Sequence, residues 1–84
     1  MKFGIYVIRD SVTGYMTPTF DMNDTSAMRN FRYAMSKSDS VMSANKSDFS
    51  LYRIGSYDSE SGEIRYEDPS VVIDVGLNAK NAND

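Results

Sequence analysis

The sequence contains no cysteine and no histidine among its 84 residues. Without cysteine the chain can form neither disulfides nor thiolate metal sites. Without histidine it lacks the commonest transition-metal ligand and the side chain that most often titrates near neutral pH. Domains this short are marginally stable unless disulfides, metals or oligomerisation support them. We therefore expect a homodimer that carries no metal and no cofactor.

Long apolar segments are also missing. The apolar run at the N-terminus covers residues 3–8 and is closed by Arg9 and Asp10. Such a run is too short for a signal-peptide core or a bilayer span, which predicts a cytoplasmic protein without membrane association. The net charge of −3 and the pI of about 4.7 argue against general coating of nucleic acid, which needs many basic residues. A local basic face is still compatible with this balance.

Catalytic signatures are absent from the sequence. The five glycines are dispersed, so that no P-loop, GxGxxG or GxSxG motif is present, and we expect no enzyme activity. Acidic residues do gather in one segment, which leaves open a Mg²⁺ or Ca²⁺ site. We favour a solvated hairpin tip, because the EF-hand spacing is lacking. The cluster comprises Asp58, Glu60, Glu63, Glu67 and Asp68.

The pattern of residues predicts an α+β fold in a single domain over residues 1–76, followed by a polar tail over 77–84. Its antiparallel sheet has three to five strands built from two hairpins, and one main amphipathic helix packs on it. Apolar and β-branched residues predict strands at 2–9, 15–17, 49–57 and 63–67, with a further short strand at 71–73. Apolar residues on both sides of the 2–9 segment predict that it is central.

The helix signal covers residues 25–37, which contain neither glycine nor proline. Several residues before it are good N-caps, and an apolar stripe of Met28, Phe31 and Met35 faces the predicted sheet. Residues 38–48 are rich in turn formers and predict a connection with one short helical turn.

Two turns share a pattern, with Asp-Ser-x-Thr-Gly at 10–14 and Asp-Ser-x-Ser-Gly at 58–62. One interpretation is a duplicated hairpin unit around the helix. The interpretation that we favour is ordinary turn chemistry used twice, because aspartate and glycine suit the same loop.

The polar side of the helix carries the most informative cluster. At 100° per residue, Arg29, Arg32 and Tyr33 lie together, away from the apolar stripe. Arginine pairs with phosphate oxygens, and tyrosine offers a ring on which bases stack. Arg53 and Arg65 on the strands extend this candidate nucleic-acid-binding site, and Arg9, Tyr6, Tyr52 and Tyr66 stand at sheet positions too. The alternative is that the arginines form a solvated helix face and the tyrosines fill a small core.

Three segments resemble the small nonstructural protein of gokushoviruses, single-stranded-DNA phages of the Microviridae. They are KFGIYVIRD at 2–10, TGYMTPTFD at 13–21 and DFSLYRIG at 48–55. The resemblance implies a nonstructural protein that binds DNA. From this and from the arginines and tyrosines above, we expect a non-enzymatic protein of the host cytoplasm that binds single-stranded rather than double-stranded DNA. The resemblance also implies a part in viral replication or in the switch to single-strand synthesis and packaging. The alternative is an adaptor that docks on a viral replication-initiation protein, a procapsid protein or a host factor.

Overall fold

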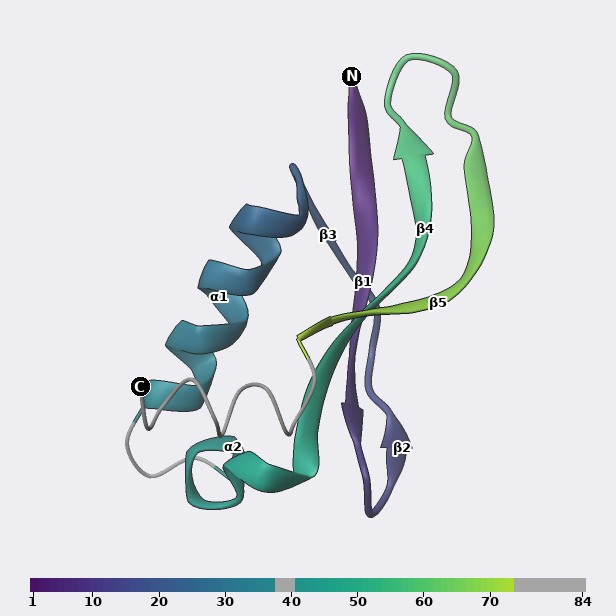
Figure 1. Cartoon of the computed structure of the whole chain (residues 1–84). Coiled ribbons are helices and arrows are strands. Elements are labelled where there is room, and N and C mark those ends of the chain that lie inside the picture. The colour runs from purple at the N-terminus through teal and green to yellow at the C-terminus, as the bar shows by residue number, and fades with distance from the viewer. Residues whose placement is uncertain (38–40, 74–84) are drawn as a thin grey trace.

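The computed structural model describes residues 1–37 and 41–73, and it confirms an α+β fold with one main helix on an antiparallel sheet (Figure 1). The predicted tail at 77–84 and the domain boundary at 76 lie outside the described residues. In chain order the elements are β1 (Lys2–Asp10), β2 (Gly14–Tyr15), β3 (Thr19–Asp21), α1 (Asp24–Ser36), α2 (Val41–Ala44), the 3-10 helix η1 (Lys46–Asp48), β4 (Phe49–Asp58) and β5 (Ile64–Ile73).

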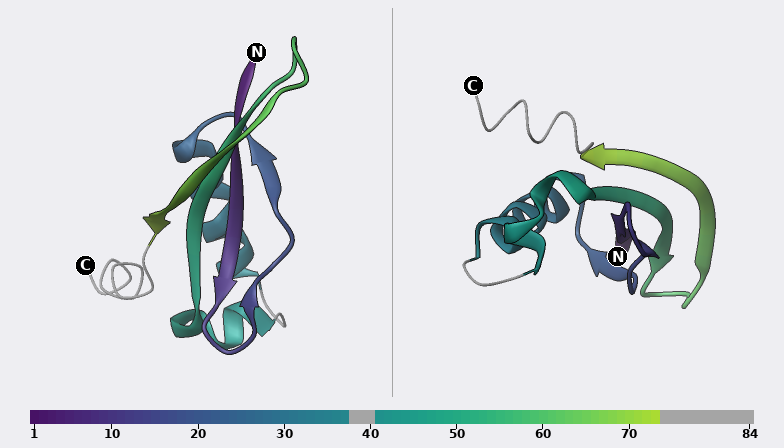
Figure 2. Two further views of the ribbon diagram at one scale, coloured as in Figure 1. Left: turned by 90° about the vertical axis from the view of Figure 1, so that its right-hand side faces the viewer. Right: turned by 90° about the horizontal axis from the view of Figure 1, so that it is seen from below.

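The sheet is built from two hairpins that meet through their first strands. Its order is β2-β1-β4-β5, and β3 also pairs with β1. β1 runs antiparallel to β4, in a register that begins with Lys2 opposite Asp58 and ends with Asp10 opposite Phe49. Figure 2 shows that β4 and β5 bend strongly and that α1 covers one face of the curled sheet. β1 therefore lies at the centre, as its apolar pattern predicts.

The core lies between α1 and the sheet. Helix residues Ala27, Phe31 and Met35 pack there against Tyr6 of β1 and Leu51 of β4. The other side of β1 is buried as well, because Ile5 and Val7 face away from Tyr6 and are 7% and 3% exposed. Burial on both sides explains why this strand is apolar at nearly every position.

Both hairpin loops use the same turn chemistry. The amide of Val12 donates to Asp10 Oδ1, and the amide of Glu60 donates to Asp58 Oδ1, each at 2.9 Å. Gly14 and Gly62 follow with φ of 101° and 76°, a left-handed conformation that glycine adopts without strain. Turn chemistry thus accounts for the repeated pattern without a duplicated unit.

Two edge strands differ from the prediction. The strand expected at 15–17 is only Gly14–Tyr15, and pairing resumes beyond Pro18 as β3. The strands expected at 63–67 and 71–73 are one strand, β5, which passes through Pro69 with two register shifts against β4. Proline is tolerated in both places because its missing N–H lies at a sheet edge.

Helix α1 begins and ends within one residue of its predicted bounds. The side chain of Asn23 caps it by accepting a 2.8 Å hydrogen bond from the amide of Ser26. Its last residue is Ser36, so Lys37 is the C-cap rather than part of the last turn. The connection that follows contains α2 and η1, where one short helical turn was expected.

Candidate functional site

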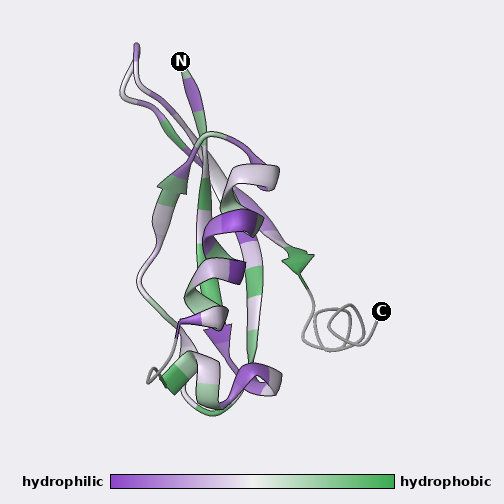
Figure 3. Ribbon diagram, turned by 90° about the vertical axis from the view of Figure 1, so that its left-hand side faces the viewer, coloured by the Kyte–Doolittle hydropathy of each residue, from purple (hydrophilic) through white to green (hydrophobic). Residues whose placement is uncertain are grey.

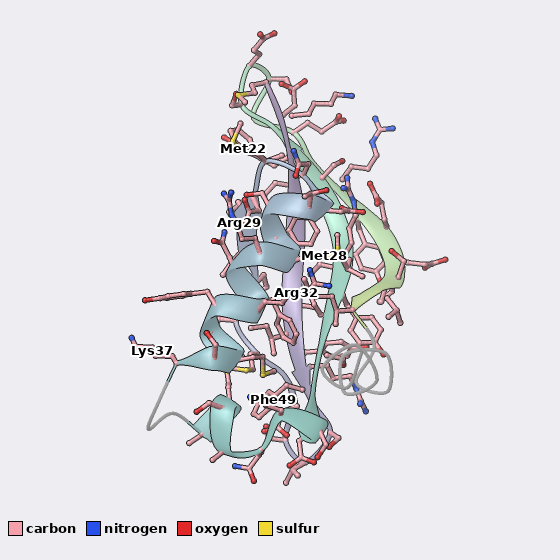
Figure 4. The ribbon with its side chains drawn as sticks, turned by 60° about the vertical axis from the view of Figure 1, so that its left-hand side comes forward. Met22, Met28, Arg29, Arg32, Lys37 and Phe49 are labelled. Atoms are coloured by element: carbon pink, nitrogen blue, oxygen red, sulfur yellow. The ribbon has the colours of Figure 1, made fainter. Side chains whose placement is uncertain are left out.

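The outward side of α1 carries Arg29, Arg32 and Tyr33, as predicted from the helical spacing. All three are exposed, and Tyr33 is 69% exposed. Figure 4 shows Arg29 on the same side of α1 as Met22, whereas Met28 lies on the side that faces β4. The ion pairs formed by the described residues include neither Arg29 nor Arg32.

The charge on this helix is strongly one-sided. Asp24 is the only acidic residue of α1, and it pairs with an arginine of the sheet. Figure 3 shows hydrophilic segments along α1, in front of strands that carry hydrophobic ones. A chain of net charge −3 therefore presents a surface on which two guanidinium groups stand outside the ion pairs of the described residues, although the charge of Arg29 acts on the carboxyl of Asp21.

Asp21 lies beside this surface, at the end of β3. Burial opposes its ionisation, but hydrogen bonds from Ser26 and Asn30 and the charge of Arg29 hold the pKa of its carboxyl below the ordinary value. The Asn30 amide donates to Asp21 Oδ2 at 2.7 Å. These contacts tie the outer side of α1 to the sheet edge.

Arg53 has a different environment from the helix arginines. Its Nη1 lies 3.2 Å from Asp24 Oδ1, and its Nε lies 3.2 Å from Glu67 Oε1. The guanidinium also stands 5.8 Å from the centre of the Tyr6 ring. Arg53 therefore connects β4 to α1 and β5, and both of its carboxylate partners reduce the positive charge that it presents.

Tyr6 of β1 also belongs to this network and joins it from the core side. Its side chain is 1% exposed, and its hydroxyl donates to Asp24 Oδ1 at 2.5 Å while accepting from Arg53 Nη1 at 3.4 Å. Burial and the neighbouring Asp24 carboxylate raise the pKa of Tyr6 to about 12. Tyr6 thus serves the core and holds a polar contact, so it is not available for stacking.

Arg53 and Arg65 are brought together in one cleft of about 300 Å³. Arg65 Nη2 lies 3.3 Å from Glu63 Oε1, and Arg53 forms an ion pair with Glu67. The positive and negative charges in the cleft therefore balance. The five predicted residues therefore separate into a helix group and a cleft group. The cleft is lined by Lys2, Arg53, Ser56, Tyr57, Asp58, Glu63, Arg65 and Glu67.

Acidic side chains of the second hairpin form ion pairs with several different cationic groups. Besides the pairs of Glu63 and Glu67, Asp58 and Glu60 lie 3.9 and 3.6 Å from the N-terminal ammonium. In residues 1–37 and 41–73, no three acidic side chains are placed to share a metal ion.

The face of the sheet opposite α1, which we call the open sheet face, was not predicted as a unit. Cross-strand pairs place Val7 beside Tyr52 and Arg9 beside Tyr15, and side chains of directly paired residues share a face. The rings of Tyr15 and Tyr52 meet edge to face at 5.8 Å, and the Arg9 guanidinium lies 5.8 Å from the Tyr15 ring centre. At the paired positions of this face Arg9 carries the only charge; the others are Phe3, Ile5, Val7, Tyr15, Phe20, Ser50, Tyr52, Gly55, Tyr57, Ile64, Tyr66 and Val71.

The signal for this face was the alternation along β1, where Phe3, Ile5 and Val7 share one side. The partners of these residues depend on the register with β4 and β5, which local patterns do not contain. The structure separates the sheet tyrosines that the sequence could only group, because Tyr6 lies under α1 whereas Tyr52 and Tyr66 lie on the open sheet face.

Comparison with known proteins identifies one family. The family model described as Phage ORF5 protein matches residues 3–79, which is most of the chain. No curated protein and no solved structure matches it. Within the described part of the chain, none of the helices has the length and apolarity to cross a membrane.

Proposed function

The chain belongs to the Phage ORF5 protein family, and on that premise we propose that it is a nonstructural gokushovirus protein that binds single-stranded DNA in the host cytoplasm. The observation that carries this proposal is the outer surface of α1. Arg29 and Arg32 belong to none of the ion pairs of the described residues and stand beside the exposed ring of Tyr33.

The mechanism is phosphate neutralisation combined with stacking. Each guanidinium offers a planar fork of donors to phosphate oxygens, and the ring of Tyr33 offers a surface for an unpaired base. A duplex hides the faces of its bases, so the tyrosine favours a single strand. A protein that holds nascent single strands would keep them out of the double-stranded pathway, which fits a switch towards single-strand synthesis and packaging.

Two phosphate contacts give modest affinity. For single strands, the logarithm of the binding constant falls by roughly 0.7 per phosphate contact for each tenfold rise in salt, so two contacts give a slope of about −1.4. A homodimer would double the number of contacts and the slope. We assign the phosphates to Arg29 and Arg32 before Arg53 and Arg65, because the latter two already face carboxylates.

The test is fluorescence anisotropy of labelled single-stranded and double-stranded oligonucleotides at two salt concentrations, with light scattering for the oligomeric state. Arg29→Glu combined with Arg32→Glu should weaken binding to the single strand at least tenfold and flatten its salt dependence. The matched control combines Lys2→Glu with Arg65→Glu, which changes the net charge equally in the charge-balanced cleft.

The control should retain binding within about threefold of the wild type, because it leaves the phosphate contacts in place. Equal losses in both double variants would mean that net charge alone matters and that α1 is not the site. Absence of binding to any oligonucleotide at tens of micromolar protein would refute the proposed function.

An adaptor is the second candidate, and the outer edge of β5 favours it. This strand is the last of the sheet, and Ile64 and Tyr66 on it are 63% and 70% exposed. A partner could add a strand to this edge and cover both side chains. Candidates are a viral replication-initiation protein, a procapsid protein or a host replication factor. Purification from infected cells that recovers such a protein without DNA would support the adaptor.

A further inference from the structure

The open sheet face contains a groove of about 270 Å³. Val7 and Ile54 line its central part, and Val7 is only 3% exposed. Tyr15 lines it from β2 at one edge of the sheet, and Tyr66 lines it from β5 at the other. These two side chains are 55% and 70% exposed, so each presents much of its ring to solvent.

The groove is chemically suited to a ligand that has a flat ring and a negatively charged group next to it. Its lining is apolar and aromatic, and the only charge at the paired positions of the face is Arg9, which stands over Tyr15. Arg9 takes part in none of the ion pairs that the described residues form. An apolar hollow between two exposed tyrosines, with a guanidinium next to one of these rings, is complementary to a base and its phosphate.

A second copy of the chain fits this face less well. A two-fold dimer brings the same surface of both copies together. The paired positions of this face hold no carboxylate, so a second copy would bring another Arg9 and no anion for the first. A phosphate group supplies that anion.

We propose that the groove between Tyr15 and Tyr66 is a base-stacking subsite for a single nucleic-acid strand, with Arg9 contacting an adjacent phosphate. This inference rests on the proposed function and extends it to the face of the sheet opposite α1. The helix surface then supplies phosphate contacts, and the groove supplies most of the interaction with the bases.

The experiment compares a labelled thymidine oligonucleotide with an abasic strand of the same length, which keeps the phosphates and lacks the bases. Tyr66→Ala and Tyr15→Ala should each weaken binding of the thymidine strand about tenfold and leave the abasic strand unchanged. Tyr66→Phe should restore binding because it keeps the ring. Ile64→Ala is the matched control, since it shortens an exposed side chain on the same strand outside the groove.

Failure of this inference can be told apart from failure of the proposed function. If both tyrosine variants bind the thymidine strand like wild type, whereas the Arg29→Glu, Arg32→Glu variant does not, the groove is not a base site and the proposed function stands. If wild type binds neither strand, the proposed function fails and the subsite fails with it. If Tyr66→Ala converts a wild-type dimer to a monomer, the groove is a self-interface and the inference is overturned.

A measurement on the unmodified protein guards against misfolded variants. Photocrosslinking to an oligonucleotide that carries bromodeoxyuridine, followed by peptide mapping, should label Tyr15 or Tyr66. Crosslinks confined to Tyr33 on α1 would overturn the subsite and leave the proposed function intact.

Discussion

The hydroxyl of Tyr6 donates a 2.5 Å hydrogen bond to Asp24, which joins the central strand to the first turn of α1. Arg53 approaches the same two groups from β4. A buried phenol, a carboxylate and a guanidinium are thereby held together by three segments that lie far apart in the sequence.

Removing the hydroxyl should weaken the fold without changing its shape. Tyr6→Phe keeps the ring in the core but deletes the bond to a charged partner, so we expect the free energy of unfolding to fall by about 1–2 kcal/mol. Urea denaturation followed by circular dichroism measures this. Tyr33→Phe is the control, because its exposed hydroxyl should contribute within about 0.5 kcal/mol. Equal stabilities of wild type and Tyr6→Phe would mean that the bond contributes nothing.

The same group predicts a loss of stability in alkali. The pKa of Tyr6 is about 12 in the folded protein against an ordinary value of 10.0. Between these two pH values the unfolded chain gives up the proton while the folded chain keeps it. The free energy of unfolding should therefore fall with rising pH by up to about 1.4 kcal/mol per unit. Below pH 10 this contribution is fully present.

The measurement is urea denaturation at several pH values from 9 to 12, for wild type and Tyr6→Phe. The variant should lose less stability over this range, so that the two curves converge towards pH 12. Parallel curves would show that Tyr6 does not carry the effect.

The two arginines of the charge-balanced cleft should differ in their effect on stability. Arg53 bonds to Asp24 and Glu67 and is 28% exposed, whereas Arg65 is 70% exposed and, among the described residues, forms an ion pair with Glu63 alone. We expect Arg53→Met to lower the free energy of unfolding by about 1–2 kcal/mol. Arg65→Met should stay within about 0.5 kcal/mol of wild type. Similar losses in both variants would contradict the assignment of Arg53 as the connecting residue.

Gly55 should not tolerate a side chain. A Cβ atom there would lie 2.5 Å from the carbonyl oxygen of Arg65, so β5 would have to move away from β4. Gly55→Ala should cost about 1–3 kcal/mol and speed hydrogen exchange along β5. Ser56→Ala on the same strand is the control and should change stability by less than about 0.5 kcal/mol. Unchanged exchange in Gly55→Ala would mean that the two strands separate easily.

Local chemistry was enough to predict the helix and the strands β1 and β4. The cap at Asn23, the stripe through Phe31 and the turns closed by Gly14 and Gly62 each depend on residues a few positions apart. The extent of the edge strands was predicted less well, because pairing resumes beyond Pro18 as β3 and one strand, β5, continues through Pro69. An edge position removes the penalty for proline, and how far an edge strand pairs depends on its partner strand rather than on its own residues.

The candidate site shows the same difference between features that nearby residues determine and features that depend on distant ones. Arg29, Arg32 and Tyr33 lie within two turns of one helix, so their shared surface followed from the helical period. Arg53 could not be placed in this way, because its partners Asp24 and Glu67 belong to α1 and β5. The groove between Tyr15 and Tyr66 depends on how far the sheet curls, which no short segment determines.

The pairing of β1 with β4 also bears on how the protein reaches its folded state. The central strand is made first, yet its partner at 49–58 follows only after α1 and the connection have been synthesised. A ribosome adds roughly 5–20 residues per second, so β1 stays without β4 for seconds while its apolar side chains are exposed. Closing such a distant contact costs loop entropy before it gains stability, which slows folding relative to a helical bundle of equal size. During that interval the nascent chain is open to aggregation, and rapid binding of a chaperone to the first ten residues would protect it.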